Sequence, residues 1–329
     1  MTVEAPPRLS YPVVAVVVLS GGSIAALLAD ILGVAPMSWV FWLASVPAMV
    51  MLAVLAVAGP VNPELRRRIR VGAAAGAVGT LGYDLVRIPF ALAGQRVFAP
   101  IESYGILIAD ASASSGLTST LGWLFHLSNG VTFGIAYAAV AARRHWAWGV
   151  AWALVLESVA VFSPFAVQYG LAGQVVPIAI AYGAHLFYGY PLGRMVQKMD
   201  PVDAGLRGVG RHTVAAVLLG AALVIVVWHR PWTTPPAERE AAGLATDAAP
   251  ATVVTRDRFA PEWLRVPIRD GGACVLVANH SGVRYETPFG VVAADGQSRL
   301  CFDGPGVYRV RLGSRPYSGG FVYVDASHI

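Results

Sequence analysis

The chain has 329 residues, of which 56% are hydrophobic and only 13% are charged, and its mean hydropathy is +0.59. These proportions exclude a single water-soluble domain, because too few polar residues are present to cover its surface. The formal net charge of +5 falls mainly in loops between apolar segments, so it predicts membrane orientation and we expect no nucleic-acid partner.

Seven apolar segments have the length of roughly 17–25 residues that a helix needs to cross about 30 Å of hydrocarbon. They lie at 11–33, 38–59, 71–94, 116–141, 147–170, 173–195 and 212–228. We therefore predict a polytopic α-helical membrane domain over residues 1–229. The first segment follows few positive charges and precedes no small-residue cleavage site, so we expect a retained helix rather than a signal peptide.

Basic residues cluster in alternate connections between these segments. They are Arg66, Arg67, Arg68 and Arg70, then Arg143 and Arg144, then Arg194, Lys198, Arg207 and Arg211. The other connections have almost none, with Arg96 as the exception. Short loops rich in Lys and Arg stay on the cytoplasmic side. This pattern predicts a multi-pass protein of the cell membrane, surrounded by lipid, with a cytoplasmic N-terminus and an extracytoplasmic C-terminal part.

The third segment combines a small-residue face with a pair of charged residues. It begins with Gly72-Ala-Ala-Ala-Gly76, a spacing that favours close contact between membrane helices. Asp84 and Arg87 are three residues apart, so they lie on one helix face and can form an ion pair. If Arg87 is engaged elsewhere, Asp84 is free to act. The connection that follows, 95–115, is the longest extracytoplasmic one, and we expect a short interfacial or re-entrant helix within it.

Two later segments share the motif H-L-x-x-G-x-x-x-G. It begins at His126 and returns 59 residues later at His185. Each histidine segment follows a segment that carries one acid and then Pro-Phe, and these acids are Asp84 and Glu157. The spacing from acid to proline differs between the two copies. We predict an internal two-helix repeat, with units at about 71–146 and 147–206.

The two histidines and the two acids are predicted to lie at one depth, near the membrane midplane. Ionisable residues are costly there, at roughly 2.5–3.5 kcal/mol on insertion scales for Asp, Lys and Arg. A repeated set at one depth therefore indicates a functional site. We expect His126, His185, Glu157 and Asp84 to form it. Outer residues that orient this set are expected at Asn129, Tyr188 and Arg87.

Several functions fit such a site. The four residues suit a Zn, Fe, Mn or Cu ion, and the two histidines suit the axial positions of a haem. The same groups suit proton-coupled transport of a small solute or ion. Hydrogen bonds that hold helices together in a structural or assembly protein are a further hypothesis. No P-loop, dinucleotide, HExxH or nucleophile motif occurs, so the sequence leaves any enzymatic activity uncertain.

The composition changes after the last apolar segment. A stretch at 230–250, rich in Pro, Ala, Thr and Glu, predicts an extended linker. From 251 to 329 the pattern is one of short alternating strands separated by turn residues. The expected strands are 263–268, 274–279, 300–302, 307–312 and 321–324. We predict a small all-β sandwich outside the cell membrane.

This last quarter of the chain resembles the cupredoxin family. The resemblance lies in the order of Phe259-x-Pro261, the strand Val275–Asn279, Phe302-x-x-Pro305-Gly-Val-Tyr308 and Gly320–Val324. It implies a cupredoxin-like β-sandwich. The segment after Tyr308, where the family carries Cys, His and Met, has none of them, so no copper is expected here. His280 is a lone histidine. We expect a binding or docking module for an extracytoplasmic protein partner.

The only two cysteines, Cys274 and Cys301, both fall in this domain. A cupredoxin topology would place their segments on neighbouring strands. A domain on the oxidising side of a membrane can keep a disulfide. We therefore predict a Cys274–Cys301 bond rather than two free thiols.

Overall fold

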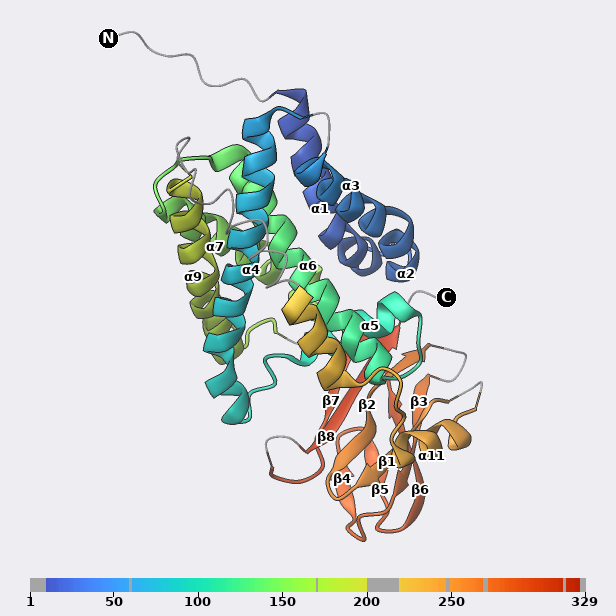
Figure 1. The fold of residues 1–329 in the computed structure, drawn as a ribbon. Helices are drawn as coiled ribbons and strands as arrows, with labels where there is room; N and C mark the ends of the chain where they lie inside the picture. The colour runs from blue at the N-terminus through green and yellow to red at the C-terminus, as the bar shows by residue number, and fades with distance from the viewer. Residues whose placement is uncertain are drawn as a thin grey trace, which may run out of the picture.

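A computed structural model describes residues 10–58, 61–169, 171–199, 219–246, 249–268, 272–315 and 318–325. Figure 1 shows a helical part that leads into a smaller β domain, drawn in orange and red. The change from helices to strands follows the change in composition near residue 250, as the sequence predicts.

Four helices are long and apolar enough to cross a membrane. They are α1 (Tyr11–Ile31), the continuous helix Met37–Val57, α6 (Gly116–Ala141) and α9 (Val175–Gln197). The second contains α2 (Met37–Val40), a π-helical turn η1 (Phe41–Ser45) and α3 (Val46–Val57). This confirms a helical part suited to a membrane, although the predicted number of seven crossings exceeds the four helices that meet these criteria among the described residues.

The other predicted segments also form helices, but of different length or character. They are α4 (Pro63–Leu92), α7 (Ala147–Val161) with α8 (Pro164–Gln168), and the helix Leu219–His229. Residues 212–218 of the seventh predicted span lie outside the described residues. The short helix expected within 95–115 is α5 (Ala99–Ala109).

Glycines bring the helix backbones into direct contact. α4 packs along both α6 and α9, and α7 packs along α9. A Cβ added at Gly72 would lie 2.6 Å from the carbonyl oxygen of Gly134, and one at Gly189 would lie 2.6 Å from that of Gly149. The motif glycines therefore serve the close packing that their spacing predicts.

The arginines at the start of α4 stabilise the ends of three neighbouring helices. Arg68 donates from Nη1 to the carbonyl oxygen of Ala139 in α6 (3.0 Å), and Arg70 donates from Nε to that of Ala56 in α3 (2.6 Å). Arg67 donates from Nη2 to the carbonyl oxygen of Met199, just beyond α9 (3.2 Å). Cations near helix C-termini satisfy the last carbonyls and oppose the helix dipole.

The β domain is a half-barrel built on one curved sheet. Its six strands lie in the order β6-β3-β1-β2-β8-β7, and β4 and β5 form a separate hairpin. β2 pairs with β1 at its start and with β8 after an irregularity between Arg258 and Trp263, so the sheet turns there. The strands are β1 (Ala251–Thr255), β2 (Arg258–Pro267), β3 (Ala273–Asn279), β4 (Tyr285–Thr287), β5 (Gly290–Val292), β6 (Gly296–Phe302), β7 (Gly306–Val310) and β8 (Gly319–Asp325).

Two sequence predictions for this part have definite outcomes. The segment 230–250 is not wholly extended, because it contains α11 (Pro236–Leu244), whose Ala and Glu residues favour a helix and whose Ala241 packs against Val253. The Cys274–Cys301 disulfide is confirmed, since the two sulfurs lie 2.14 Å apart and the residues face each other on β3 and β6. The cupredoxin-like identity of the domain stays a prediction.

The β domain is joined to the helical part by backbone pairing. Residues 112–114 lie along β2, where the amide of Ser114 donates to the carbonyl of Trp263 and the amide of Arg265 donates to that of Ser112, both at 2.8 Å. The Trp263 ring stacks on Phe321 at a centroid distance of 4.5 Å and packs in one core with α5. The loop before α6 therefore acts as an added strand.

Arg265 fixes this junction electrostatically. Its guanidinium donates to Asp325 on β8 and to Asp110 at the end of α5, with Nη distances of 2.5 Å to each. Burial opposes the charge of Arg265, but the attraction of Asp325 and the hydrogen bonds to both carboxylates outweigh it and raise the pKa of this guanidinium. The Arg265 guanidinium at this junction is thus held in its charged form.

The glycine contacts predict a large difference between two substitutions in α9. Gly189→Ala places a methyl group against the α7 backbone and should destabilise the protein by about 1–3 kcal/mol. Gly183→Ala, on the same helix, meets nothing within 4 Å and should stabilise it by about 0.5–1 kcal/mol. Thermal unfolding of the two purified variants compares them directly. Equal melting temperatures would contradict the packing described here.

Candidate functional site

The first acid–histidine pair joins α4 to α6. Nε2 of His126 lies 3.0 Å from Oδ1 and 3.1 Å from Oδ2 of Asp84. Both neighbours are carboxylate oxygens, so Nε2 carries the hydrogen and donates it. The Asp84 side chain is also 3.5 Å from Nη1 of Arg87, the ion pair expected from their i, i+3 spacing.

The second pair joins α7 to α9. Nδ1 of His185 lies 3.2 Å from Oε2 of Glu157 and 2.9 Å from the carbonyl oxygen of Ala181, one turn earlier in α9. Both neighbours are acceptors, so Nδ1 carries the hydrogen. Glu157 is buried, with 8% of its surface exposed. Each predicted acid therefore meets the histidine of the next long helix.

Tyr83 and Arg87 lie between the two pairs. The Tyr83 ring contacts both imidazoles, with centroid distances of 4.8 Å to His185 and 5.9 Å to His126. The Arg87 guanidinium carbon lies 4.6 Å from the centroid of Tyr83 and 4.6 Å from that of Phe98. Arg87 is thus a buried cation held by a carboxylate and two aromatic faces.

The charges of this site do not cancel when both imidazoles are neutral. Asp84 and Glu157 supply two carboxylates, whereas Arg87 supplies one guanidinium. Arg87 lies 3.5 Å from Asp84 and attracts Glu157 only from farther off, so the charge of Glu157 is the one left partly uncompensated. A buried charge without a partner costs several kcal/mol, about 3–5 kcal/mol when one member of a buried pair is removed. The site therefore favours binding one further positive charge at the Glu157–His185 pair.

The sequence prediction of one shared centre is only partly matched. His126, His185, Asp84, Glu157 and Arg87 do gather in one region, but as two pairs with the Tyr83 ring touching both imidazoles. Within the described ranges no group of three or more His, Cys, Asp or Glu residues is placed to hold a metal ion. Each pair offers one imidazole and one carboxylate. The metal and haem hypotheses stay predictions.

Besides Arg87, the other two expected outer residues, Tyr188 and Asn129, have different surroundings. Tyr188 donates its hydroxyl hydrogen to the carbonyl oxygen of Gly130 at 2.7 Å, and so links α9 to α6 beside the site. Its ring also packs against Gly79 of α4. Asn129 is buried on α6, but its Oδ1 has no hydrogen-bond partner among the residues that the structure describes. The described hydrogen bonds of His126 go to Asp84, and the orienting role expected of Asn129 stays a prediction.

Sequence reasoning missed two features of this site. The first is Tyr83, which precedes Asp84 and could have been singled out because a tyrosine next to an acid in an apolar segment is itself polar. The second is a better alignment of the two units. Gly76 precedes Asp84 by eight residues, and Gly149 precedes Glu157 by eight residues. These glycines contact the motif glycines of α6 and α9, whereas the prolines used for the first alignment do not mark equivalent positions.

Comparison with known protein families, with curated proteins and with solved structures yields no match for this chain. Its function is therefore inferred from the geometry and chemistry of its own side chains.

The Asp84–Arg87 pair predicts strong coupling between two substitutions. Arg87→Met leaves the half-buried Asp84 and the buried Glu157 without a guanidinium and should destabilise the protein by about 3–5 kcal/mol. Adding Asp84→Asn removes one of those charges and should restore part of the loss, with a coupling energy of about 0.5–3 kcal/mol. Melting temperatures of the purified variants measure both effects. As a control, Arg299→Met changes an exposed arginine and should have little effect. A double variant no more stable than Arg87→Met would refute the coupling.

Proposed function

We propose that this chain is a multi-pass membrane protein that binds and releases a proton at its acid–histidine site, and that it couples this step to transport of a small solute or ion. The observation that carries the proposal is the charge imbalance at Glu157. One proton shared by Glu157 and His185 makes that pair neutral, either as carboxylic acid and imidazole or as carboxylate and imidazolium. Intramembrane ionisable residues of this kind mark proton pathways in transporters.

Proton binding has a direct mechanical consequence at these positions. Each carboxylate joins two helices, because Asp84 holds α4 to α6 and Glu157 holds α7 to α9. A protonated carboxyl accepts a weaker hydrogen bond than a carboxylate, so uptake of a proton loosens one helix pair relative to the other. A proton that binds one arrangement more tightly shifts the population towards it. Glycines at the helix contacts have no side chains that interlock, which favours movement of one helix along the other.

The two helix pairs support the predicted internal repeat. In each, a glycine eight residues before the acid packs against the glycines that follow the histidine. The helices form a row, α6–α4–α9–α7, because α4 packs on both α6 and α9. Helices that carry a histidine alternate with helices that carry an acid along this row. This order is expected if the second unit of the repeat is displaced from the first by a translation along the row. The two-fold axis along the membrane normal that equal helix directions suggest would place like helices side by side instead.

We extend the proposal to the topology. Seven crossings follow if α4, α7 and the segment ending at His229 span the membrane with the four longer helices. The arginine distribution then places the N-terminus in the cytoplasm and the β domain outside. For that domain we propose a cupredoxin-like, copper-free module that docks a protein partner. The half-barrel with its cross-strand disulfide is consistent with this role.

Metal or haem binding is the alternative function, and assembly of a membrane complex is another. The residues that would hold a metal are His126, His185, Glu157 and Asp84, but they make up two pairs of two ligands. Elemental analysis and an absorption spectrum of the purified protein test this alternative, and a stoichiometric metal or haem would replace the proton hypothesis.

The proton site predicts a titration that depends on Glu157. Infrared difference spectra of the full-length protein, taken as the pH is lowered, should contain a carboxyl or imidazolium band from the Glu157–His185 pair. Glu157→Gln should remove it, because the amide cannot exchange a proton. Glu64→Gln, at the more exposed cytoplasmic end of α4, is the control and should keep the band. Identical spectra for the wild type and Glu157→Gln would reject the proposal.

The topology predicts opposite results for two reporter fusions. A reporter that works only in the cytoplasm should be inactive after Ile329 and active after Arg144, since the two positions lie on opposite sides of the proposed membrane. Activity in cells expressing each fusion decides the point. A cytoplasmic signal from the Ile329 fusion would overturn the orientation.

A further inference from the structure

A polar hollow of about 430 Å³ lies at one end of the β domain. It is formed by the turn between β1 and β2 together with the connection between β7 and β8. The strands β2 and β8 lead from this end, at Arg258 and Gly319, to the junction with the helices, at Asp325. The hollow therefore lies at the end of the sheet away from that junction. The described residues that line it are all polar or charged, and they are Thr255, Arg256, Asp257, Arg258 and Arg315.

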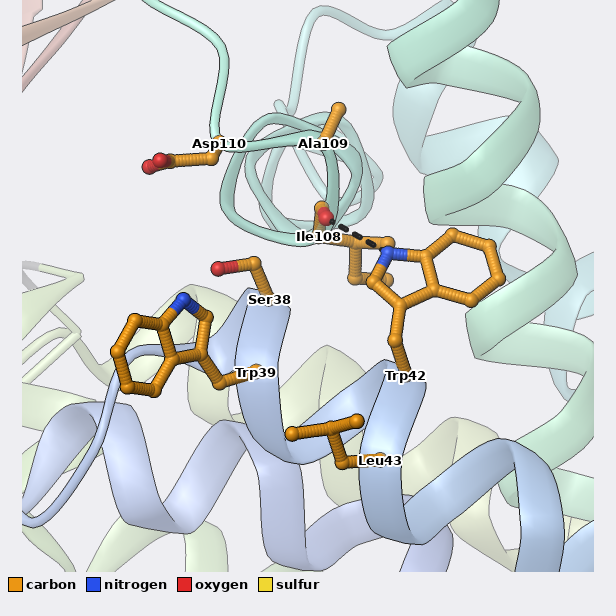
Figure 2. Close-up of a pocket in the computed structure, with 7 residues that line it drawn as sticks. All are labelled: Ser38, Trp39, Trp42, Leu43, Ile108, Ala109 and Asp110. Carbon is orange, nitrogen blue, oxygen red and sulfur yellow. Dashed lines mark hydrogen bonds between the residues drawn. The ribbon is translucent and has the colours of Figure 1, made fainter.

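This lining differs from that of a hollow beside the helix Met37–Val57. Figure 2 shows that second hollow, with Trp39, Trp42 and Leu43 on one side and the last turn of α5 on the other. Trp39 and Leu43 are exposed on a helix that is long and apolar enough to cross a membrane. Contact with lipid accounts for such an apolar surface. The hollow in the β domain suits a polar and charged occupant instead.

The charge of Arg256 is not offset by an ion pair with any acidic side chain among the described residues. Thr255 pairs with Arg258, so Arg256 is the first residue of a two-residue hairpin turn, and its φ is +62°. Hairpin turns favour glycine at a position with positive φ. An arginine costs stability in this backbone conformation, and residues held in such conformations concentrate at functional sites. The Arg256 guanidinium is thus placed for a ligand rather than for the stability of the turn.

The other charges of the hollow leave it positive. Nη1 of Arg315 lies 3.6 Å from Oδ2 of Asp257, which is too long for a hydrogen bond, and the Arg315 side chain is 79% exposed. Its N–H groups therefore remain able to donate to a ligand. Arg256 and Arg315 together supply two positive charges against the one carboxylate of the described lining. Arg258 also lines the hollow, but this positive balance is present without it.

We infer that this hollow binds a small soluble phosphate monoester whose remaining part carries hydroxyl groups, as in a sugar phosphate. Guanidinium groups match phosphate oxygens with paired hydrogen bonds. The two guanidinium groups come from separate segments, and a phosphate has three terminal oxygens to accept from both, whereas a carboxylate has two. The hollow has the size of small-molecule sites, about 300–1,000 Å³, so it has room for more than the phosphate. The Asp257 carboxylate and the Thr255 hydroxyl then bind hydroxyl groups of the ligand.

Isothermal titration calorimetry of the full-length protein in detergent, at constant ionic strength, tests this inference. Glucose 6-phosphate should bind more tightly than inorganic phosphate, and glucose should not bind. A short-chain phosphatidic acid should bind no more tightly than inorganic phosphate, because the hollow lies away from the helices. Tighter binding of that lipid would assign the phosphate to a membrane and overturn the inference. Failure of the wild type to bind glucose 6-phosphate, or equal binding of glucose, would overturn it as well.

Arg256→Gly separates binding from stability. It removes the guanidinium and should weaken glucose 6-phosphate binding about ten- to a hundredfold, as expected for hydrogen bonds to a charged group. It should not lower the melting temperature, because glycine readily adopts a positive φ. Arg299→Met is the control, since it removes an exposed arginine of β6 outside the hollow, and it should bind as the wild type does.

Wild-type binding by Arg256→Gly would overturn the inference. Should this variant melt at a lower temperature, Arg315→Met replaces it in the same titration, because the Arg315 side chain is largely exposed and has no hydrogen bond in the described part of the chain. Arg315→Met should also weaken glucose 6-phosphate binding at least about tenfold. Unchanged binding by Arg315→Met would then reject the site.

Discussion

The pairing of each acid with a histidine of a neighbouring helix is the constraint on which the arrangement of the helical part depends. Asp84 has a short side chain, so it reaches His126 only if α4 and α6 are in backbone contact. Gly72 and Gly134 provide that contact, since a single methyl group at either position would separate the helices. The acid–histidine contact therefore depends on the glycines that let the two helices approach. The same combination on α7 and α9 uses the longer Glu157.

Much of this arrangement of acids, histidines and glycines could be predicted from the sequence. Glycine spacing predicts the close contacts, and matched depth predicts that acids and histidines meet. The choice of partners was not predictable, because it depends on the order of the helices. A central cluster of His126 and His185 would require like helices to face each other across an axis. The observed row instead pairs each histidine with the acid of its own unit, and Tyr83 occupies the space beside both imidazoles.

The β domain, too, could be predicted from the sequence only in part. Alternating apolar residues identified five of its strands, and the two cysteines identified one strand pair. The junction with the helices was missed, because Ala111–Ser115 reads as a turn when taken alone. Its backbone groups instead pair with β2, which is a tertiary event without a local signal. α11 was missed for the opposite reason, since Pro235 and Pro236 mask a short helix that Pro236 in fact begins.

The connection between α4 and α5 contacts both the β domain and the acid–histidine site. Arg96 forms an ion pair with Glu262 of β2 and lies over the ring of Phe321. Two residues later, Phe98 covers the guanidinium of Arg87. Arg96 and Phe98 share one short backbone segment, so the residue that contacts the β domain and the ring that covers Arg87 lie only two positions apart. The surroundings of Arg87 are thus joined to the β domain through the segment 96–98.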